Sequence, residues 1–137
     1  MFLLDNDAEG VDAYRKLQAL NLPGNMRSML MPDVDELRNF LARGPQGVSN
    51  CDINGRAAAI ECYLDLNLKD YPPAQVLWSN YKKEIDAWQG ALEHKESYTR
   101  HFLDQTRENL VTGYDTSKLI KLLDALISEA ALLLTVD

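Results

Sequence analysis

The sequence predicts an α/β fold in which a short parallel β-strand unit, ordered strand–helix–strand, is followed by a mainly helical C-terminal half. The chain opens on the apolar run "MFLL", which turns directly into the acidic stretch "DNDAEG". A continuous apolar run of this kind is typical of a parallel strand that is covered on both faces. Helical periodicity follows at once, and a leucine-rich helical pattern closes the chain.

The first elements follow from local patterns. Residues 1–5 are expected to form a strand, and residues 8–20 a helix, because apolar side chains recur there at helical spacing and Asp7 is a suitable N-cap. Residues 25–31 are expected to form a second strand, which Pro32 ends. The connection between two such parallel strands is expected to be right-handed.

The later elements are expected to be mostly helical, because turn-forming residues separate stretches of helical periodicity. In order, we expect a helix at 32–42, a polar loop at 43–55, a helix at 55–66, a strand or short helix at 76–81, a mostly helical stretch at 82–109 and a last helix at about 115–134.

Two regions of one compact unit are expected. The character of the chain changes near residues 43–55, so residues 1–66 are interpreted as a partial α/β region and residues 67–137 as a helical region that packs on it.

Composition favours a cytoplasmic globular protein. Hydrophobic residues make up 46% of the chain and charged residues 26%, with a net charge of −7. No basic leader precedes the first apolar run, and the apolar C-terminal segment is too interrupted by charges to span a membrane. Cys51 and Cys62 are interpreted as reduced thiols. An acidic surface repels phosphate backbones, so nucleic-acid binding by this chain alone is expected to be weak.

Asp5 and Asp7 are the best candidates for functional residues. Side chains two positions apart point to the same side of an extended backbone, so both can face the crevice beyond the strand end. Paired carboxylates are hard oxygen ligands that suit Mg²⁺, and Glu9 can add a ligand through water. The alternative is that Asp7 is only a helix cap and that Glu9 interacts with the helix dipole.

Two further residues carry open alternatives. Glu61 lies on an otherwise apolar stretch and either faces the site or faces solvent. Arg56 suits a phosphate contact at a helix start, whereas the preceding Asn54-Gly55 is also typical of a simple turn.

The strand followed by "DNDAEG", that is D-x-D-x-x-G, resembles the second signature of Toprim domains, which occur in topoisomerases, primases and OLD-type defence nucleases. The segment "IECYL" at 60–64 is similar to one in OLD-like proteins and their HEPN-fused relatives. The resemblance implies Mg²⁺-dependent, nuclease-type phosphoryl transfer, with Asp5 and Asp7 as metal ligands and Glu61 as an additional acidic group.

The resemblance also implies a missing part. In Toprim domains a strand bearing a catalytic Glu precedes the Asp pair, whereas this sequence starts on the Asp strand. We therefore expect the C-terminal part of such a domain, incomplete as this chain, which pairs with an upstream partner chain or a second copy through its N-terminal strand edge.

Two rival interpretations remain. One is a non-catalytic interaction or adaptor protein, such as an inactivated remnant that binds a partner through the exposed strand and apolar helices. The other is a small helical regulatory protein in which "DNDAEG" is only a capping turn.

Overall fold

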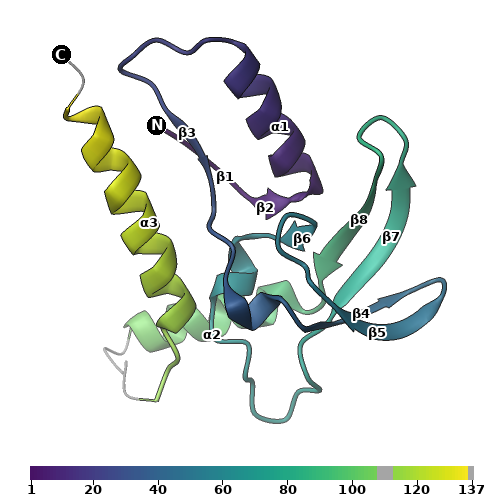
Figure 1. Ribbon diagram of the computed structural model, residues 1–137. Helices are drawn as coiled ribbons and strands as arrows, with labels where there is room; N and C mark the ends of the chain where they lie inside the picture. Colours follow the sequence, from purple (N-terminus) through teal and green to yellow (C-terminus); the bar gives the residue numbers. More distant parts are fainter. Residues whose placement is uncertain (108–112, 136–137) are drawn as a thin grey trace.

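The computed structural model describes residues 1–107 and 113–135 and has a mixed α/β architecture (Figure 1). Its strands are β1 (Phe2–Leu4), β2 (Asn6–Asp7), β3 (Ser28–Leu30), β4 (Phe40–Gly44), β5 (Gly47–Cys51), β6 (Ala57–Ala58), β7 (Val76–Lys82) and β8 (Ala87–Leu92). Its helices are α1 (Ala8–Ala19), α2 (Lys95–Arg107) and α3 (Ser117–Leu133), with 3₁₀ turns η1 (Asp35–Leu37) and η2 (Ile60–Tyr63).

The predicted strand–helix–strand order is confirmed at the start of the chain. Strand β1 pairs in parallel with β3, and α1 connects them. The Asp7 side chain caps α1 as expected, because its Oδ1 accepts a hydrogen bond from the Gly10 N–H at 2.7 Å. The second strand begins at Ser28, later than the predicted residue 25, so the stretch after Pro23 is a turn.

Gly10 explains the spacing of the D-x-D-x-x-G stretch. A Cβ atom at this position would lie 1.9 Å from the backbone carbonyl oxygen of Asp5. Only glycine therefore lets the first turn of α1 approach the end of β1 so closely. This close approach brings the first turn of α1, which Asp7 caps, against the backbone of Asp5 at the end of β1.

A second sheet, with strand order β5-β4-β7-β8, corrects two predictions. The predicted helix at 32–42 and loop at 43–55 are instead η1 followed by the antiparallel hairpin β4–β5. The glycine-bounded turn between Gly44 and Gly47, with Gly47 at φ +108°, reverses the chain and lets β4 and β5 pair. Strand β4 also pairs in parallel with β7, so pairing with distant residues outweighs the local helical pattern.

The C-terminal half is less helical than predicted. The expected helix at 55–66 is β6 and the single turn η2, because β2 pairs with β6 and the side chains of Ala57 and Ala58 are buried. In the expected helical stretch at 82–109, β7 ends at Lys82, β8 pairs with β7, and the chain is helical only from Lys95 to Arg107. The last two residues of that prediction, 108 and 109, lie outside the described residues. The strand at 76–81 and the last helix are confirmed as β7 and α3.

One hydrophobic core joins segments from both predicted regions. Leu37, Ile53 and Tyr63 from the first region are buried together with Val76 and Tyr98 from the second. Figure 1 shows α2 and η2 beside the base of the four-stranded sheet and α3 alongside β3. Among the described residues, none of the helices has the length and apolar character needed to cross a membrane.

Replacing Gly10 by Ala is expected to destabilise the protein by about 2 kcal/mol or more, because the new methyl group forces α1 away from β1. Alanine otherwise stabilises a helix relative to glycine by about 1 kcal/mol. Urea denaturation measures the change, and Ala13→Gly on the same helix is the control, with an expected loss of about 1 kcal/mol. A stabilised Gly10→Ala variant would contradict the close packing.

Candidate functional site

The two predicted acids flank the junction between β1 and β2. Asp5 follows the last residue of β1, and its Oδ1 accepts a hydrogen bond from the Ile60 N–H at 3.1 Å. Asp7 lies at the end of β2, where its carboxylate caps α1. The carboxylate of Asp5 therefore touches the start of η2, the turn that carries Glu61.

The three predicted acids interact electrostatically. Partial burial raises the pKa of the Asp5 carboxyl above 3.8, and repulsion from Asp7 and then from Glu61 raises it further, while the hydrogen bond from Ile60 opposes this. Burial is the largest cause of this shift, and the repulsion from the neighbouring carboxylates adds to it. A bound cation would relieve that repulsion.

Glu9 contacts a different part of the protein. Its carboxylate forms an ion pair with Lys82 of β7 and accepts a hydrogen bond from the Gln89 side chain of β8 at 2.9 Å. These contacts attach the first turn of α1 to the β7–β8 hairpin. They do not test its predicted role as a metal ligand through water, which stays a prediction.

The donor set fits part of a Mg²⁺ site. Within residues 1–107 and 113–135, no group of three or more His, Cys, Asp or Glu side chains is arranged to hold a metal ion. Mg²⁺, however, is commonly bound through one or two carboxylates, with waters and substrate phosphates as its other ligands. Asp5 and Asp7 supply carboxylates of this kind at the end of a strand.

Sequence reasoning missed the residues that hold the acidic segment in place. Asn6, between the two acids, is only 2% exposed, and its Nδ2 donates a hydrogen bond to Asp33 Oδ1 at 2.7 Å. Tyr63 of η2 donates from its hydroxyl to the Pro32 carbonyl oxygen at 2.7 Å. In an extended segment neighbouring side chains point to opposite sides, so the pattern that predicts outward-facing acids at 5 and 7 also predicts an inward-facing amide at Asn6 that needs a partner.

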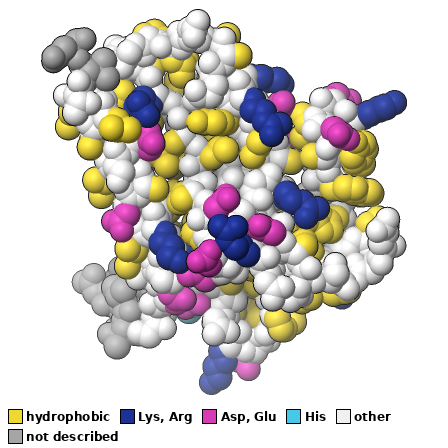
Figure 2. All heavy atoms as spheres, viewed as in Figure 1, with side chains coloured by type: hydrophobic (Ala, Val, Ile, Leu, Met, Phe, Trp, Pro, Cys, Tyr) yellow, Lys and Arg dark blue, Asp and Glu magenta, His cyan; other side chains and the backbone are white. Residues whose placement is uncertain are grey.

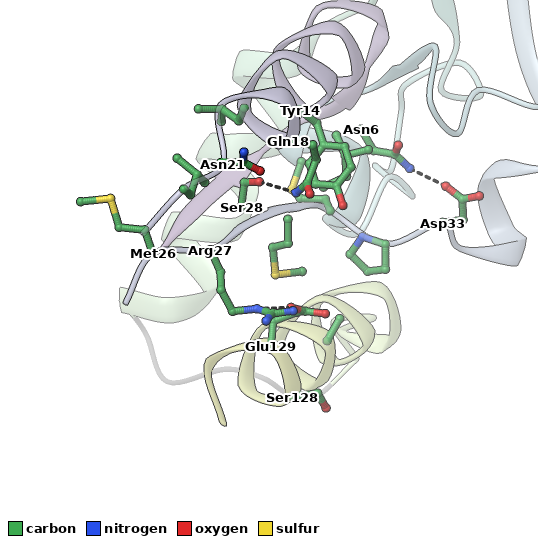
Figure 3. Close-up of a pocket in the computed structure, with 17 residues that line it drawn as sticks. Asn6, Tyr14, Gln18, Asn21, Met26, Arg27, Ser28, Asp33, Ser128 and Glu129 are labelled. Atoms are coloured by element: carbon green, nitrogen blue, oxygen red, sulfur yellow. Dashed lines mark hydrogen bonds and ion pairs between the residues drawn. The ribbon is translucent and has the colours of Figure 1, made fainter. Parts of the chain in front are cut away.

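A large hollow in the described part of the protein lies elsewhere. It has a volume of about 770 Å³ and lies between α1, β3 and α3 (Figure 3). An ion pair between Arg27 and Glu129, at 2.8 Å, and a hydrogen bond from Gln18 to Ser28, at 2.9 Å, lie along it. Asp5, Asp7 and Glu61 do not line it, so its size does not bear on the acidic site.

Comparison of the chain with protein-family models, curated proteins and solved structures gives no match. The geometry and charge of the three carboxylates are therefore the basis for a functional assignment.

Replacing Asp5 by Asn is expected to stabilise the metal-free protein at neutral pH by about 0.2–0.5 kcal/mol, the range for exposed charges screened by solvent. Asn keeps an oxygen that accepts from the Ile60 N–H while removing the repelled charge. The pKa of Asp5 is raised by folding, so the cost of its charge is complete at neutral pH and declines as pH falls through the folded pKa toward 3.8. Denaturation at several pH values should show the gain of Asp5→Asn shrinking in acid.

Asp35→Asn is the matched control, because the opposite sign is expected there. The hydrogen bond and charge of Arg38 lower the pKa of Asp35, so its charged form favours the folded state. Removing that charge should destabilise the protein at neutral pH, and the loss should fade as pH falls through the unfolded pKa toward the folded one. Equal effects of the two variants would rule out specific repulsion at Asp5.

Proposed function

We propose that this chain is a Toprim-like, Mg²⁺-dependent phosphoryl-transfer module of the nuclease type. The observation that carries the proposal is the pair of interacting carboxylates, Asp5 and Asp7, at the end of the parallel strand β1. Gly10, which follows the two acids at the D-x-D-x-x-G spacing, supports the proposal. Its close contact with the Asp5 backbone explains why the motif needs glycine at this position.

Each proposed residue has a separate role. Asp5 and Asp7 hold the cation, and Glu61 adds negative charge beside Asp5 that favours a divalent over a monovalent ion. A bound Mg²⁺ would supply stabilisation of the negative charge that develops on phosphoryl oxygens. The Ile60 N–H fixes one oxygen of Asp5, so the carboxylate is oriented before the cation arrives.

The module is proposed to be incomplete as this chain. Two carboxylates with one acidic neighbour bind Mg²⁺ weakly on their own, since this ion needs near-ideal octahedral geometry. A substrate phosphate and an acidic group on a partner strand beside β1 would complete the set. We therefore expect activity of the isolated chain to be low.

Titration of the metal-free protein with Mg²⁺ or Mn²⁺ by calorimetry is expected to show binding that Asp5→Asn and Asp7→Asn each remove or greatly weaken. Asn is as good an N-cap as Asp, so Asp7→Asn removes the carboxylate without losing the start of α1. Saturating metal should also raise the Tm of the wild-type protein but not of either variant.

Asp35→Asn, which removes an exposed carboxylate outside the site, is the control and should bind the metal like the wild-type protein. Identical isotherms for the wild-type protein and both site variants would refute the metal site and leave Asp7 as a capping residue only.

A second candidate function is that of a non-catalytic adaptor that binds a partner chain. The observation that favours it is the exposure of large apolar side chains on β1 and its start, namely Met1, Phe2 and Leu3 at 39–44%. Within the described residues β1 pairs only with β3, so no second strand pairs along its other edge. Parallel sheets are normally covered on both faces, whereas these side chains are exposed. Apolar side chains of α3, including Ile120, Leu123 and Ile127, are also exposed.

If β1 is an interface, Phe2→Ser is expected to reduce association of the protein. Analytical ultracentrifugation should show an average mass that rises with protein concentration for the wild type and rises less for the variant. Leu103→Ser, which removes an exposed apolar side chain of α2, is the control and should associate like the wild type. A wild-type monomer at every concentration would exclude a homo-oligomer through this edge.

A further inference from the structure

A cleft bordered by arginines and aromatic side chains runs across one face of the four-stranded sheet. Two hollows, of about 280 and 350 Å³, share Arg56 and Trp88 in their walls. Trp78 borders the first hollow, and Tyr81 and Arg15 border the second. We call this the Arg–Trp cleft; it lies between α1, the β7–β8 hairpin and the β4–β5 turn, which Figure 1 shows around the loop leading into β6.

Two glycines make room for the Trp78 ring in this cleft. A Cβ atom at Gly90, its cross-strand partner on β8, would lie 2.5 Å from the Trp78 ring, and one at Gly44 on β4 would lie 3.2 Å from it. The indole therefore occupies the space that side chains would fill on both neighbouring strands. The Trp78 ring thus forms one wall of the first hollow.

The cations of the cleft are available to an anion. The Arg56 guanidinium lies 4.8 Å from the centre of the Trp78 ring and donates to the Asp52 carbonyl oxygen at 3.4 Å. Neither Arg56 nor Arg15 forms an ion pair with a carboxylate in the described part of the chain. A guanidinium of this kind suits phosphate oxygens, which it can bind through two parallel hydrogen bonds.

The aromatic side chains of the cleft are open to solvent. Trp88 is 40% exposed and Tyr81 46% exposed, and their rings meet edge to face with centroids 5.9 Å apart. Two acids also border the cleft, Asp12 and Asp86, and Asp12 forms an ion pair with Lys16 at 2.6 Å. Figure 2 shows basic and apolar side chains side by side over this part of the molecule, on a surface that also carries acidic groups.

The cleft opens next to the candidate metal site. The backbone of Arg56 forms a bridge with that of Asp7, so the two residues are neighbours in space. A further small hollow, of about 40 Å³, is lined by Asp7 together with Arg56 and Gln89. Arg56 therefore connects the cleft to the segment that carries Asp7.

We propose that the Arg–Trp cleft binds an unpaired nucleotide of a single-stranded nucleic acid, with its base stacked on Trp88 and its phosphate at Arg56. Stacking on an exposed aromatic ring beside an arginine is how single strands are bound without sequence preference. Arg56 and Arg15 are the cations that the cleft offers to a phosphate, although Asp12 and Asp86 also border it and the net charge of the protein is −7. The proposal that the ligand is a nucleic acid rests on the proposed function, but binding in the cleft does not require the metal.

The test is fluorescence anisotropy of a labelled oligothymidylate of about ten nucleotides, measured in EDTA at low salt with the whole protein. Trp88→Ala is expected to weaken binding on the order of tenfold, the effect of losing one stacked base. Arg56→Gln is expected to weaken binding and to lower the slope of log K against log salt by about 0.7, since one phosphate contact is lost. Circular dichroism melting checks that both variants are folded.

Arg100→Gln is the matched control, because Arg100 is exposed on α2 outside the cleft. It should leave affinity and salt slope unchanged. The proposal would be overturned if Arg100→Gln weakened binding as much as Arg56→Gln, or if Trp88→Ala left binding unchanged. It would also be overturned if a duplex of the same length bound as tightly, or if the oligonucleotide did not bind at all. Competition by thymidine monophosphate distinguishes a site for free nucleotides from one that needs a strand; the proposal requires the strand to compete better.

The two proposals fail separately in these experiments. Asp5→Asn should remove Mg²⁺ binding and leave oligonucleotide affinity in EDTA unchanged. If the wild-type protein binds the oligonucleotide but not Mg²⁺, only the phosphoryl-transfer module is refuted. If the wild-type protein binds Mg²⁺ but not the oligonucleotide, only the Arg–Trp cleft is refuted.

Discussion

The segment Asp5–Asp7 is the junction on which the arrangement of the molecule depends. Asp5 binds the backbone of η2, Asn6 binds Asp33 after β3, and β2 pairs with β6. Asp7 at the same time starts α1. The segment thus joins β1, α1 and the end of β3 to β6 and η2, and the β6–η2 stretch in turn contacts the four-stranded sheet and α3.

Local signals predicted the elements that depend on local interactions. The apolar opening run, the cap at Asp7 and the leucine-rich last helix are properties of neighbouring residues, and β1, α1 and α3 formed where expected. The β4–β5 and β7–β8 hairpins depend on partners, and β4 pairs with β7 across more than thirty intervening residues. The helical spacing of apolar residues at 32–42 and 82–109 predicted helices, but parts of both segments form strands. Strand formation depends on packing against the neighbouring strand and on burial, which the local sequence does not reveal.

The sequence predicts which acids form the candidate site, and that role stays a prediction, whereas it does not predict the framework around them. The alternation of an extended chain predicts that Asp5 and Asp7 point to the same side. Burial first, and then repulsion from Asp7, raises the pKa of Asp5. The Asn6–Asp33 hydrogen bond, the Ile60 contact and the Glu9 ion pair with Lys82 join residues far apart in sequence, so no local pattern announces them. Repulsion among carboxylates costs stability, which proteins commonly accept at sites where charge is needed for function.

Trp78 and its two flanking glycines have a consequence for how this sequence can change over generations. A side chain at Gly44 or Gly90 collides with the indole, whereas loss of the indole alone leaves a trough across three strands. No single substitution at these positions keeps the surface filled and unstrained. Related chains that retain this sheet should therefore either keep all three residues or have exchanged them together, and the trio would serve as a marker of common descent where the remaining sequence has diverged.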